Sequence, residues 1–277
     1  MDTYASTAFS VAKLVTNAYS TSFGSASRLF AKPIRKHIYA IYGLVRIADE
    51  IVDTYRGDDA RQILDELQAE TARAVRRGYS ANPVVHAFAL TAAQYGIDDD
   101  LTRPFFASMA MDLVPQHYDQ QLLDTYIHGS AEVIGLMCLR VFCDGDQQAY
   151  DKLAPGARRL GAAYQKVNFL RDIAHDIGSL ERDYFAIGGL PLTDEVKRSI
   201  EQDIHQDFQA ARTYIDQLPS GARDAVRASF VYYHELLTVI VRTPATTLST
   251  TRIRVSDRRK TVLLAGVMAR RLRGARI

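Results

Sequence analysis

The stretch Asp49-Glu50-Ile51-Val52-Asp53 is matched about 120 residues later by a second one, Asn168-Phe169-Leu170-Arg171-Asp172-Ile173-Ala174-His175-Asp176. Each stretch places carboxylates at positions i and i+4, which share one face of a helix about 6 Å apart. Like charges stacked in this way destabilise a helix unless a cation lies between them. Mg2+ prefers carboxylate oxygens together with the phosphates of a substrate. Because Arg46 and Arg171 flank the two pairs, the sequence predicts a site for a Mg2+-diphosphate complex.

Both stretches lie in apolar surroundings. A single pair of aspartates four residues apart is usually a solvated helix face. Here residues 37–45, which precede the first stretch, and residues 160–170, which lead into the second, are rich in side chains that prefer burial. A charge placed among such residues must be paired or bound to a metal. The sequence therefore favours a functional interpretation of both stretches.

The composition sets broad limits on the class of protein. The chain has 277 residues, of which 47% are hydrophobic, so it can bury a large core in one large or two ordinary domains. We expect a single domain over residues 1–277. The net charge is only +2, which does not indicate a nucleic-acid partner or an acidic tail.

The two cysteines and the N-terminus bear on the compartment. Cys138 and Cys143 lie five residues apart in an apolar run, which gives neither a disulfide framework nor a four-ligand zinc site. We expect both to be reduced core residues of a cytoplasmic protein. The N-terminus does not have the pattern of a signal peptide, and no continuous run of eighteen apolar residues is present, so we expect a soluble protein.

Hydrophobic periodicity predicts an all-α fold. Apolar residues recur at i, i+3 and i+4 along most of the chain, and no strong alternating strand pattern appears. Turn and cap residues separate the periodic segments without forming a long linker. We expect core helices around a central cavity, with the two acidic motifs facing each other at its mouth. The predicted helices span residues 7–22, 32–55, 60–77, 83–95, 99–112, 122–142, 147–172, 194–217, 220–241 and 256–273.

Three segments together resemble the squalene/phytoene synthase family. They are STSF at residues 20–23, AIYGLVRIADEIVD at residues 40–53 and QKVNFLRDIAHD at residues 165–176. The resemblance extends from near residue 8 to about residue 265 and is greatest to bacterial phytoene synthases. It implies an all-α isoprenoid synthase fold and a prenyltransferase that joins two prenyl diphosphates head to head.

The resemblance also implies roles for individual residues. The metal ligands would be Asp49, Asp53, Asn168, Asp172 and Asp176. The four aspartates would also be catalytic, together with Tyr126. The implied substrate-binding residues are Ser20, Ser22, Phe23, Ser27, Tyr42, Arg46, Gln165, Asn168, Arg171, Tyr184, Tyr233 and Arg252.

Two positions depart from the family pattern. Glu50 stands where Asp is commoner, and its longer side chain leaves direct metal coordination open. Glu132 replaces a small residue in a segment, residues 130–135, that should line the cavity. Either the backbone turns this carboxylate away from the cavity, or the carboxylate pairs with a cation such as Arg140 or Lys166.

For the chemistry, the resemblance implies ionisation of an allylic diphosphate with Mg2+, or Mn2+, as cofactor. Arginines would absorb the charge that develops on the leaving diphosphate. The allylic cation would be attacked by the double bond of a second prenyl chain, and the resulting cyclopropyl (prephytoene) diphosphate would rearrange to a 1-1′ linked hydrocarbon. A phytoene synthase ends this reaction by proton loss, so no NADPH is expected, whereas a squalene synthase uses NADPH.

Three functions follow as hypotheses. The first is a phytoene synthase that joins two geranylgeranyl diphosphates in carotenoid and isoprenoid biosynthesis. The second is a squalene or dehydrosqualene synthase that uses the C15 farnesyl diphosphate. The third is a non-catalytic relative that acts as an assembly or lipid-binding module, which retention of both aspartate pairs argues against.

Two further expectations concern the lipid tails. Ser27 lies four residues after Phe23, where a small side chain would leave room for a C20 tail; alternatively, Ser27 caps the next helix or faces solvent. The basic C-terminal segment, with cations at residues 258–260 and 270–276, is either a solvated helix face or a peripheral contact with anionic lipid at the inner face of the membrane. The oligomeric state is not indicated by the sequence.

Overall fold

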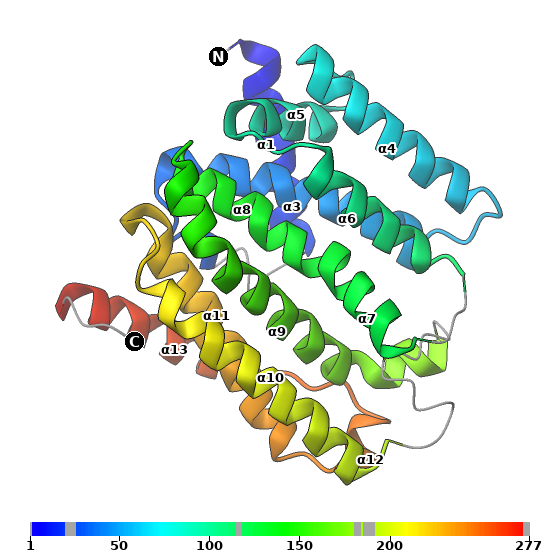
Figure 1. The fold of residues 1–277 in the computed structure, drawn as a ribbon, viewed down its shortest axis with the longest axis vertical. Helices are drawn as coiled ribbons and strands as arrows, with labels where there is room; N and C mark the ends of the chain where they lie inside the picture. The colour runs from blue at the N-terminus through cyan, green and yellow to red at the C-terminus, as the bar shows by residue number, and fades with distance from the viewer. Residues whose placement is uncertain (1, 20–25, 115–117, 180–183, 185–191, 274–277) are drawn as a thin grey trace.

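The structure is a computed structural model that describes residues 2–19, 26–114, 118–179, 184 and 192–273, with the side chains of residues 175–179 and 270–273 left out. Within these ranges all regular structure is helical, which confirms the predicted all-α class (Figure 1). The elements are α1 Thr3–Tyr19, α3 Lys32–Asp53, α4 Ala60–Arg77, α5 Pro83–Tyr95, α6 Asp99–Met111, α7 Gln120–Ile127, η1 His128–Glu132, α8 Val133–Cys143, α9 Gln147–Ser179, α10 Asp194–Ile215, α11 Ser220–Val241, α12 Ala245–Leu248 and α13 Asp257–Arg273.

Local chemistry explains where the helices begin and end. The Asn82 side chain accepts a hydrogen bond from the Val84 amide at 3.0 Å at the start of α5. Gly78 and Gly96 end α4 and α5 in the left-handed conformation, at φ 72° and 66°. The predicted bounds of α4, α5 and α11 agree with the structure. The predicted helix ending at residue 172 instead continues to Ser179, so the whole second acidic stretch is helical.

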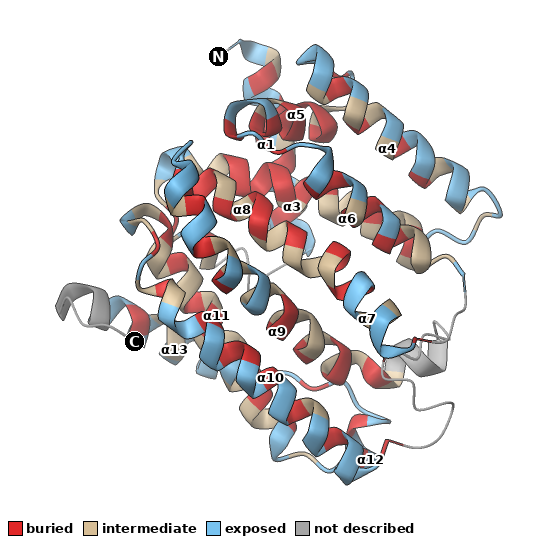
Figure 2. Ribbon diagram, in the orientation of Figure 1, coloured by how far each residue is buried: buried red, intermediate tan, exposed pale blue. Residues whose placement is uncertain are grey.

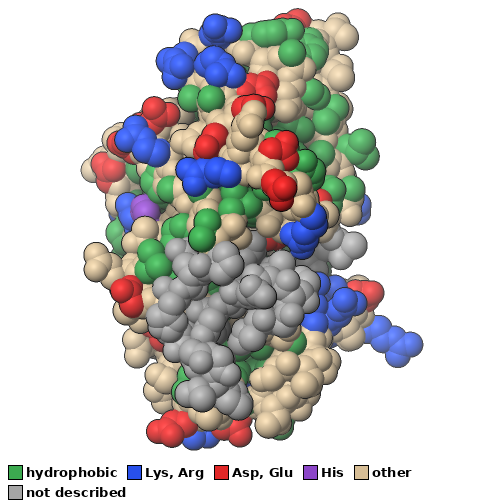
Figure 3. Space-filling view, turned by 90° about the vertical axis from the view of Figure 1, so that its right-hand side faces the viewer, with side chains coloured by type: hydrophobic (Ala, Val, Ile, Leu, Met, Phe, Trp, Pro, Cys, Tyr) green, Lys and Arg blue, Asp and Glu red, His purple; other side chains and the backbone are tan. Residues whose placement is uncertain are grey.

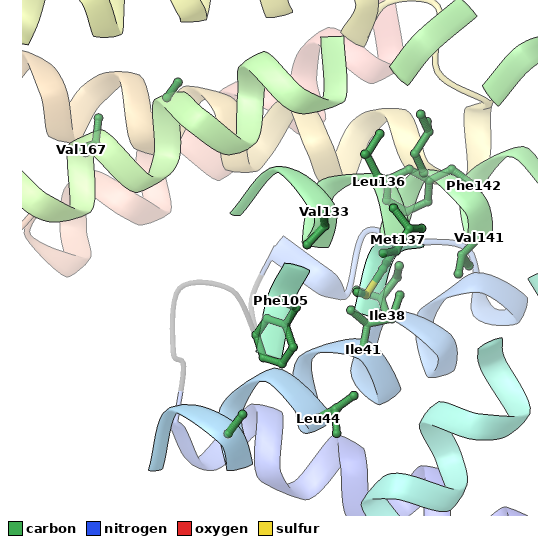
Figure 4. Close-up of a cluster of buried hydrophobic side chains, with 14 of the residues drawn as sticks. Ile38, Ile41, Leu44, Phe105, Val133, Leu136, Met137, Val141, Phe142 and Val167 are labelled. Atoms are coloured by element: carbon green, nitrogen blue, oxygen red, sulfur yellow. The ribbon is translucent and has the colours of Figure 1, made fainter. Parts of the chain in front are cut away.

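The main hydrophobic core lies where α3 packs against α8. Ile38, Ile41 and Leu44 project from successive turns of α3, and the first two face Met137 of α8 in Figure 4. These buried side chains recur at three-residue spacing, as a helix face requires. Figure 2 shows this central region as the most buried part of the fold, while α4 and α10 turn one side to solvent. The first acidic stretch therefore sits at the end of a helix that the core holds in place.

A wide helical turn interrupts the segment predicted as one helix over residues 122–142. Residues His128–Glu132 form the π-helical turn η1 between α7 and α8. A Cβ atom added to Gly129 would overlap the Ser108 hydroxyl and the Pro104 carbonyl oxygen of α6. A Cβ on Gly161 of α9 would lie 2.8 Å from the carbonyl oxygen of Ala131. Glycine on both sides therefore lets η1 approach α6 and α9 closely.

The wide turn also decides the orientation of Glu132. Its carboxylate accepts a hydrogen bond at 2.9 Å from His128 Nδ1 when that nitrogen is protonated, and it lies 3.6 Å from Arg158. Ser130 and Ala131 line the cavity instead. Glu132 is thus outside the cavity lining, as the first alternative predicts, and it also pairs with a cation, as the second predicts. Its partners are neither of the cations named from the sequence: Lys166 bonds to Asp203 and Asp207, and Arg140 bonds to Gln147.

The structure bears on the expected state of the cysteines and on the expected lack of a membrane span. Cys138 and Cys143 are both free thiols, as expected. Among the described residues, one helical stretch, Gln120–Cys143, is long and apolar enough to cross a membrane by length and composition, although it contains no continuous run of eighteen apolar residues. However, 61% of its most apolar window is buried inside the fold, as in the core helix of a globular protein, so it is weak evidence for a membrane span.

The close approach of η1 to α6 yields a stability prediction. We expect Gly129→Ala to destabilise the protein by roughly 1–3 kcal/mol, because the new methyl group must displace the α6 backbone. Urea unfolding followed by circular dichroism measures this change. Gly266→Ala is the matched control, since no atom lies within 4 Å of its added Cβ and alanine favours a helix. Equal stability of the two variants would show that η1 tolerates a side chain here.

Candidate active site

An apolar cavity of about 320 Å3 runs along α9. Its lining begins at Leu153 and reaches Asn168, which corresponds to about 22 Å at 1.5 Å rise per residue. Helices α3, α8, α10 and α11, together with η1, supply the other walls. Apolar side chains that line the cavity include Phe30, Ile38, Val45, Ile134, Leu139, Phe142, Leu160, Ile215, Leu218 and Val226. The cavity therefore suits a long hydrocarbon chain rather than a polar ligand.

Polar side chains gather at one end of the cavity. Tyr42, Asn168 and Tyr233, all predicted as substrate contacts, line it together. The Tyr233 hydroxyl donates a hydrogen bond to Asn168 Oδ1 at 3.3 Å, and its ring stacks on Tyr164 with centroids 3.9 Å apart. The predicted metal-binding aspartates follow one or two turns further along α3 and α9. The cavity thus leads from an apolar interior to both acidic stretches.

The first acidic stretch is paired with Arg46. This guanidinium lies 3.7 Å from Asp49 and is hydrogen-bonded to Glu50. Glu50 therefore has an arginine partner in this structure. Burial, the largest cause, and the nearby carboxylates of Asp53, Asp112 and Glu50 together raise the pKa of Asp49 to about 7, against the lowering effect of Arg46. A cation bound here would relieve this repulsion.

The second acidic stretch is held by two arginines. Asp172 is contacted by Arg171, its neighbour in sequence, and by Arg252 from the segment between α12 and α13. The predicted late diphosphate contact Arg252 is therefore at the site. Gln165 lies one turn before Asn168 on α9 and is partly buried. Asp176 belongs to α9, but its side chain is outside the described residues.

Asp112 is a site residue that the sequence did not reveal. Its carboxylate accepts hydrogen bonds from Tyr126 at 2.9 Å and from Tyr184 at 3.0 Å, and its charge contributes to the raised pKa of Asp49. The Tyr184 ring stacks on Phe169, beside Asn168, at 4.2 Å. Asp112 thus connects the first acidic stretch to the tyrosines that pack on α9. A lone aspartate at the end of a helix has no motif around it, so only the structure identifies it.

Four predicted contacts precede helix α3. Ser20, Ser22 and Phe23 lie outside the described residues, and only Ser27 can be placed. Ser27 is fully buried, and its hydroxyl donates to the Tyr39 hydroxyl at 3.2 Å. Among the described residues of that segment, Ala26 and Phe30 line the cavity. The expectation that Ser27 faces the tail is therefore not what the structure shows, because its turn points this side chain toward α3.

The donor set suits a magnesium ion that is shared with a ligand. In the described part of the chain, no three Asp, Glu, His or Cys side chains converge on one point. The carboxylates instead lie on two helices, each beside arginines. Mg2+ is usually held by one or two carboxylates together with substrate phosphates. These residues fit that arrangement, with phosphate oxygens completing the coordination.

Comparison with known proteins supplies the family. A sequence profile of the squalene/phytoene synthase family matches residues 16–187. The chain belongs to this family. It is therefore a prenyltransferase of isoprenoid biosynthesis. Members of this family act on prenyl diphosphates.

Individual relatives show how far the similarity extends. A phytoene synthase of Cereibacter sphaeroides is 28% identical over 278 residues, covering 91% of this chain and 76% of the relative. A presqualene diphosphate synthase of Zymomonas mobilis is 29% identical, covering 80% of this chain and 81% of the relative. The chain spans only about half the length of several other curated phytoene synthases.

A solved structure supports the fold. The crystal structure of a dehydrosqualene synthase in complex with a ligand superimposes with a TM-score of 0.82 at 18% sequence identity, covering 98% of both chains. This confirms the isoprenoid synthase fold predicted from the sequence.

The contacts of Asp112 yield the second prediction. We expect Asp112→Asn to reduce turnover roughly 10–100-fold, because an amide oxygen accepts from one tyrosine while its NH2 group cannot accept from the other. Steady-state product formation measures the loss, and circular dichroism checks the fold. Asp124→Asn is the control, since this exposed carboxylate on α7 accepts a hydrogen bond from Gln120 and from no other side chain that the structure describes. Wild-type turnover by a folded Asp112→Asn enzyme would remove Asp112 from the site.

Proposed function

We propose that this protein is a phytoene synthase that condenses two geranylgeranyl diphosphates head to head and releases diphosphate. The observation that carries the proposal is an apolar cavity whose lining reaches Val45 of α3 and Asn168 of α9, each one helical turn before an arginine-paired aspartate, Asp49 or Asp172. An allylic diphosphate has the same division, with a long hydrocarbon tail and a highly charged head. When bound, Mg2+, or Mn2+ in its place, would neutralise the head group and favour departure of the diphosphate.

The chain's own residues explain the remaining requirements of ionisation. Arg46, Arg171 and Arg252 can donate charge-assisted hydrogen bonds to diphosphate oxygens. The apolar walls exclude water, which would quench an allylic cation. The stacked rings of Tyr164 and Tyr233 lie on the cavity wall and present π faces that attract a cation. The protein therefore needs no nucleophile of its own.

The length of the cavity supports a C20 rather than a C15 tail. Its lining continues for about 22 Å along α9. Each further CH2 group buried in such a cavity contributes about 0.8 kcal/mol to binding. The C15 alternative, a squalene or dehydrosqualene synthase, is favoured by the similarity to the presqualene diphosphate synthase of Zymomonas mobilis. Chain length therefore needs a direct test.

We also propose that the protein is cytoplasmic and touches the membrane peripherally, since its substrates and product are lipids. Helix α13 packs on α11 and leaves Val262 and Met268 exposed beside basic side chains such as Arg258. Such a helix face can bind an anionic lipid surface. The side of the molecule in Figure 3 shows acidic and basic side chains interspersed. A membrane contact through α13 would thus be local, and would not depend on the charge of the whole protein.

The third prediction tests the reaction itself. Purified protein with Mg2+ is expected to convert geranylgeranyl diphosphate to a C40 hydrocarbon without NADPH, as seen by chromatography of the extract. EDTA should stop the reaction and excess Mg2+ should restore it. Asp49→Ala and Asp172→Ala should each abolish turnover while the helical spectrum is kept. A preference for farnesyl diphosphate would support the C15 alternative, and a folded protein inactive on both substrates would support a non-catalytic relative.

The fourth prediction concerns the deep end of the cavity. We expect Ala157→Leu to reduce the C40 product and to retain activity on farnesyl diphosphate, because the added bulk shortens the cavity. The ratio of products from the two substrates measures this change. Ala154→Leu is the matched control, since it adds the same bulk to α9 at a partly buried position outside the cavity lining. An unchanged ratio in Ala157→Leu would mean that this wall does not select tail length.

A further inference from the structure

Both carboxylate oxygens of Asp172 are covered by guanidinium groups. Arg171 Nε lies 3.1 Å from each oxygen, and Arg171 Nη2 lies 2.5 Å from Oδ2. Arg252 approaches from another element, with its Nε 2.7 Å from Oδ1 and its Nη2 3.4 Å from Oδ2. A carboxylate has about four lone-pair positions. The two arginines therefore occupy the oxygens that a metal ion would need.

Arg252 is the more exposed of the two partners. It lies in the segment between α12 and α13, and its side chain is 54% exposed, against 21% for Arg171. An exposed ion pair contributes little to stability, so this contact can be exchanged at small cost. Arg46 at the first acidic stretch differs, since its side chain is 24% exposed and its guanidinium stacks on the Tyr19 ring at 4.4 Å. A partner exchange is thus easier at Asp172.

The groove beside Asp172 offers Arg252 another partner. Arg171, Arg252, Arg254 and Lys260 line it together with one carboxylate, Asp257, which lies 3.0 Å from Lys260. A diphosphate bound there would carry more negative charge than one carboxylate and would compete for the same guanidinium groups. Arg252 cannot make its full set of hydrogen bonds to Asp172 and to diphosphate at the same time. A diphosphate bound in this groove would therefore free an Asp172 oxygen.

We propose that Arg252 makes metal and diphosphate binding synergistic: it covers Asp172 in the free enzyme and turns to the diphosphate group when that ligand arrives, which opens the carboxylate to the metal. The inference rests on the proposed Mg2+-diphosphate site and adds that diphosphate binding promotes metal binding there. Linkage requires the effect to be reciprocal, so bound metal must raise the affinity for diphosphate by the same factor. The free enzyme then binds Mg2+ weakly although its aspartates are in place.

Isothermal titration calorimetry tests this coupling. MgCl2 is titrated into the free protein and into protein loaded with inorganic diphosphate, with a protein-free titration to subtract the Mg2+-diphosphate complex. Wild type is expected to bind Mg2+ roughly tenfold or more tightly when diphosphate is present. Arg252→Gln should bind Mg2+ alone more tightly than wild type does, bind diphosphate more weakly, and lose most of the coupling.

Arg254→Gln is the matched control. It removes the same charge from the same groove, but Arg254 makes no ion pair with a described residue. It should keep the wild-type coupling and the wild-type affinity for Mg2+ alone. The inference is overturned if Arg252→Gln binds Mg2+ alone no more tightly than wild type, or if both variants gain affinity equally. Independent binding of the two ligands by wild type overturns it while leaving the proposed function intact, and failure to bind either ligand overturns both.

Discussion

Repulsion between carboxylates is the constraint on which the site depends. Burial, together with the charges of the nearby Asp53 and Asp112, raises the pKa of Asp49 to about 7. Arginines balance part of this charge at both acidic stretches. The core around α3 and α8 holds the carboxylates in this unfavourable arrangement. The clustered carboxylates that suit a cationic ligand therefore destabilise the helices that carry them, and packing of the core offsets this cost.

The two acidic stretches are joined by aromatic packing as well as by charge. Tyr126 and Tyr184 share the carboxylate of Asp112, and Tyr184 stacks on Phe169 of α9. Tyr126 precedes the wide turn η1, which Gly129 lets approach α6. A displacement of this turn would therefore alter hydrogen bonds at the site. The position of the tyrosines depends on backbone contacts as much as on their own side chains.

Periodicity predicted most of the helices, because their apolar faces are buried against one core. It could not predict the π turn at residues 128–132, since a wide turn changes the hydrogen-bond pattern without changing the composition. The paired aspartates were identifiable because two motifs reinforce each other, whereas Asp112 stands alone in sequence and acquires its role only from Tyr126 and Tyr184. The sequence placed Ser27 beside the lipid tail, whereas its hydroxyl bonds to Tyr39. The direction of a single side chain cannot be assigned without knowing which elements surround it.

The same helix carries the cavity wall and the second acidic stretch, and this has a geometric consequence. Helix α9 runs from Leu153 through Asn168 to Asp172 without a break. Positions that face the cavity recur once per turn, or about every 5.4 Å. The distance from Asp172 to each cavity-facing position of α9 is therefore close to a whole number of helical turns. A bulky side chain at one of these positions would block the cavity at that distance. Under the proposed function, the length of tail that fits should change in steps of about one turn as the bulky residue changes position.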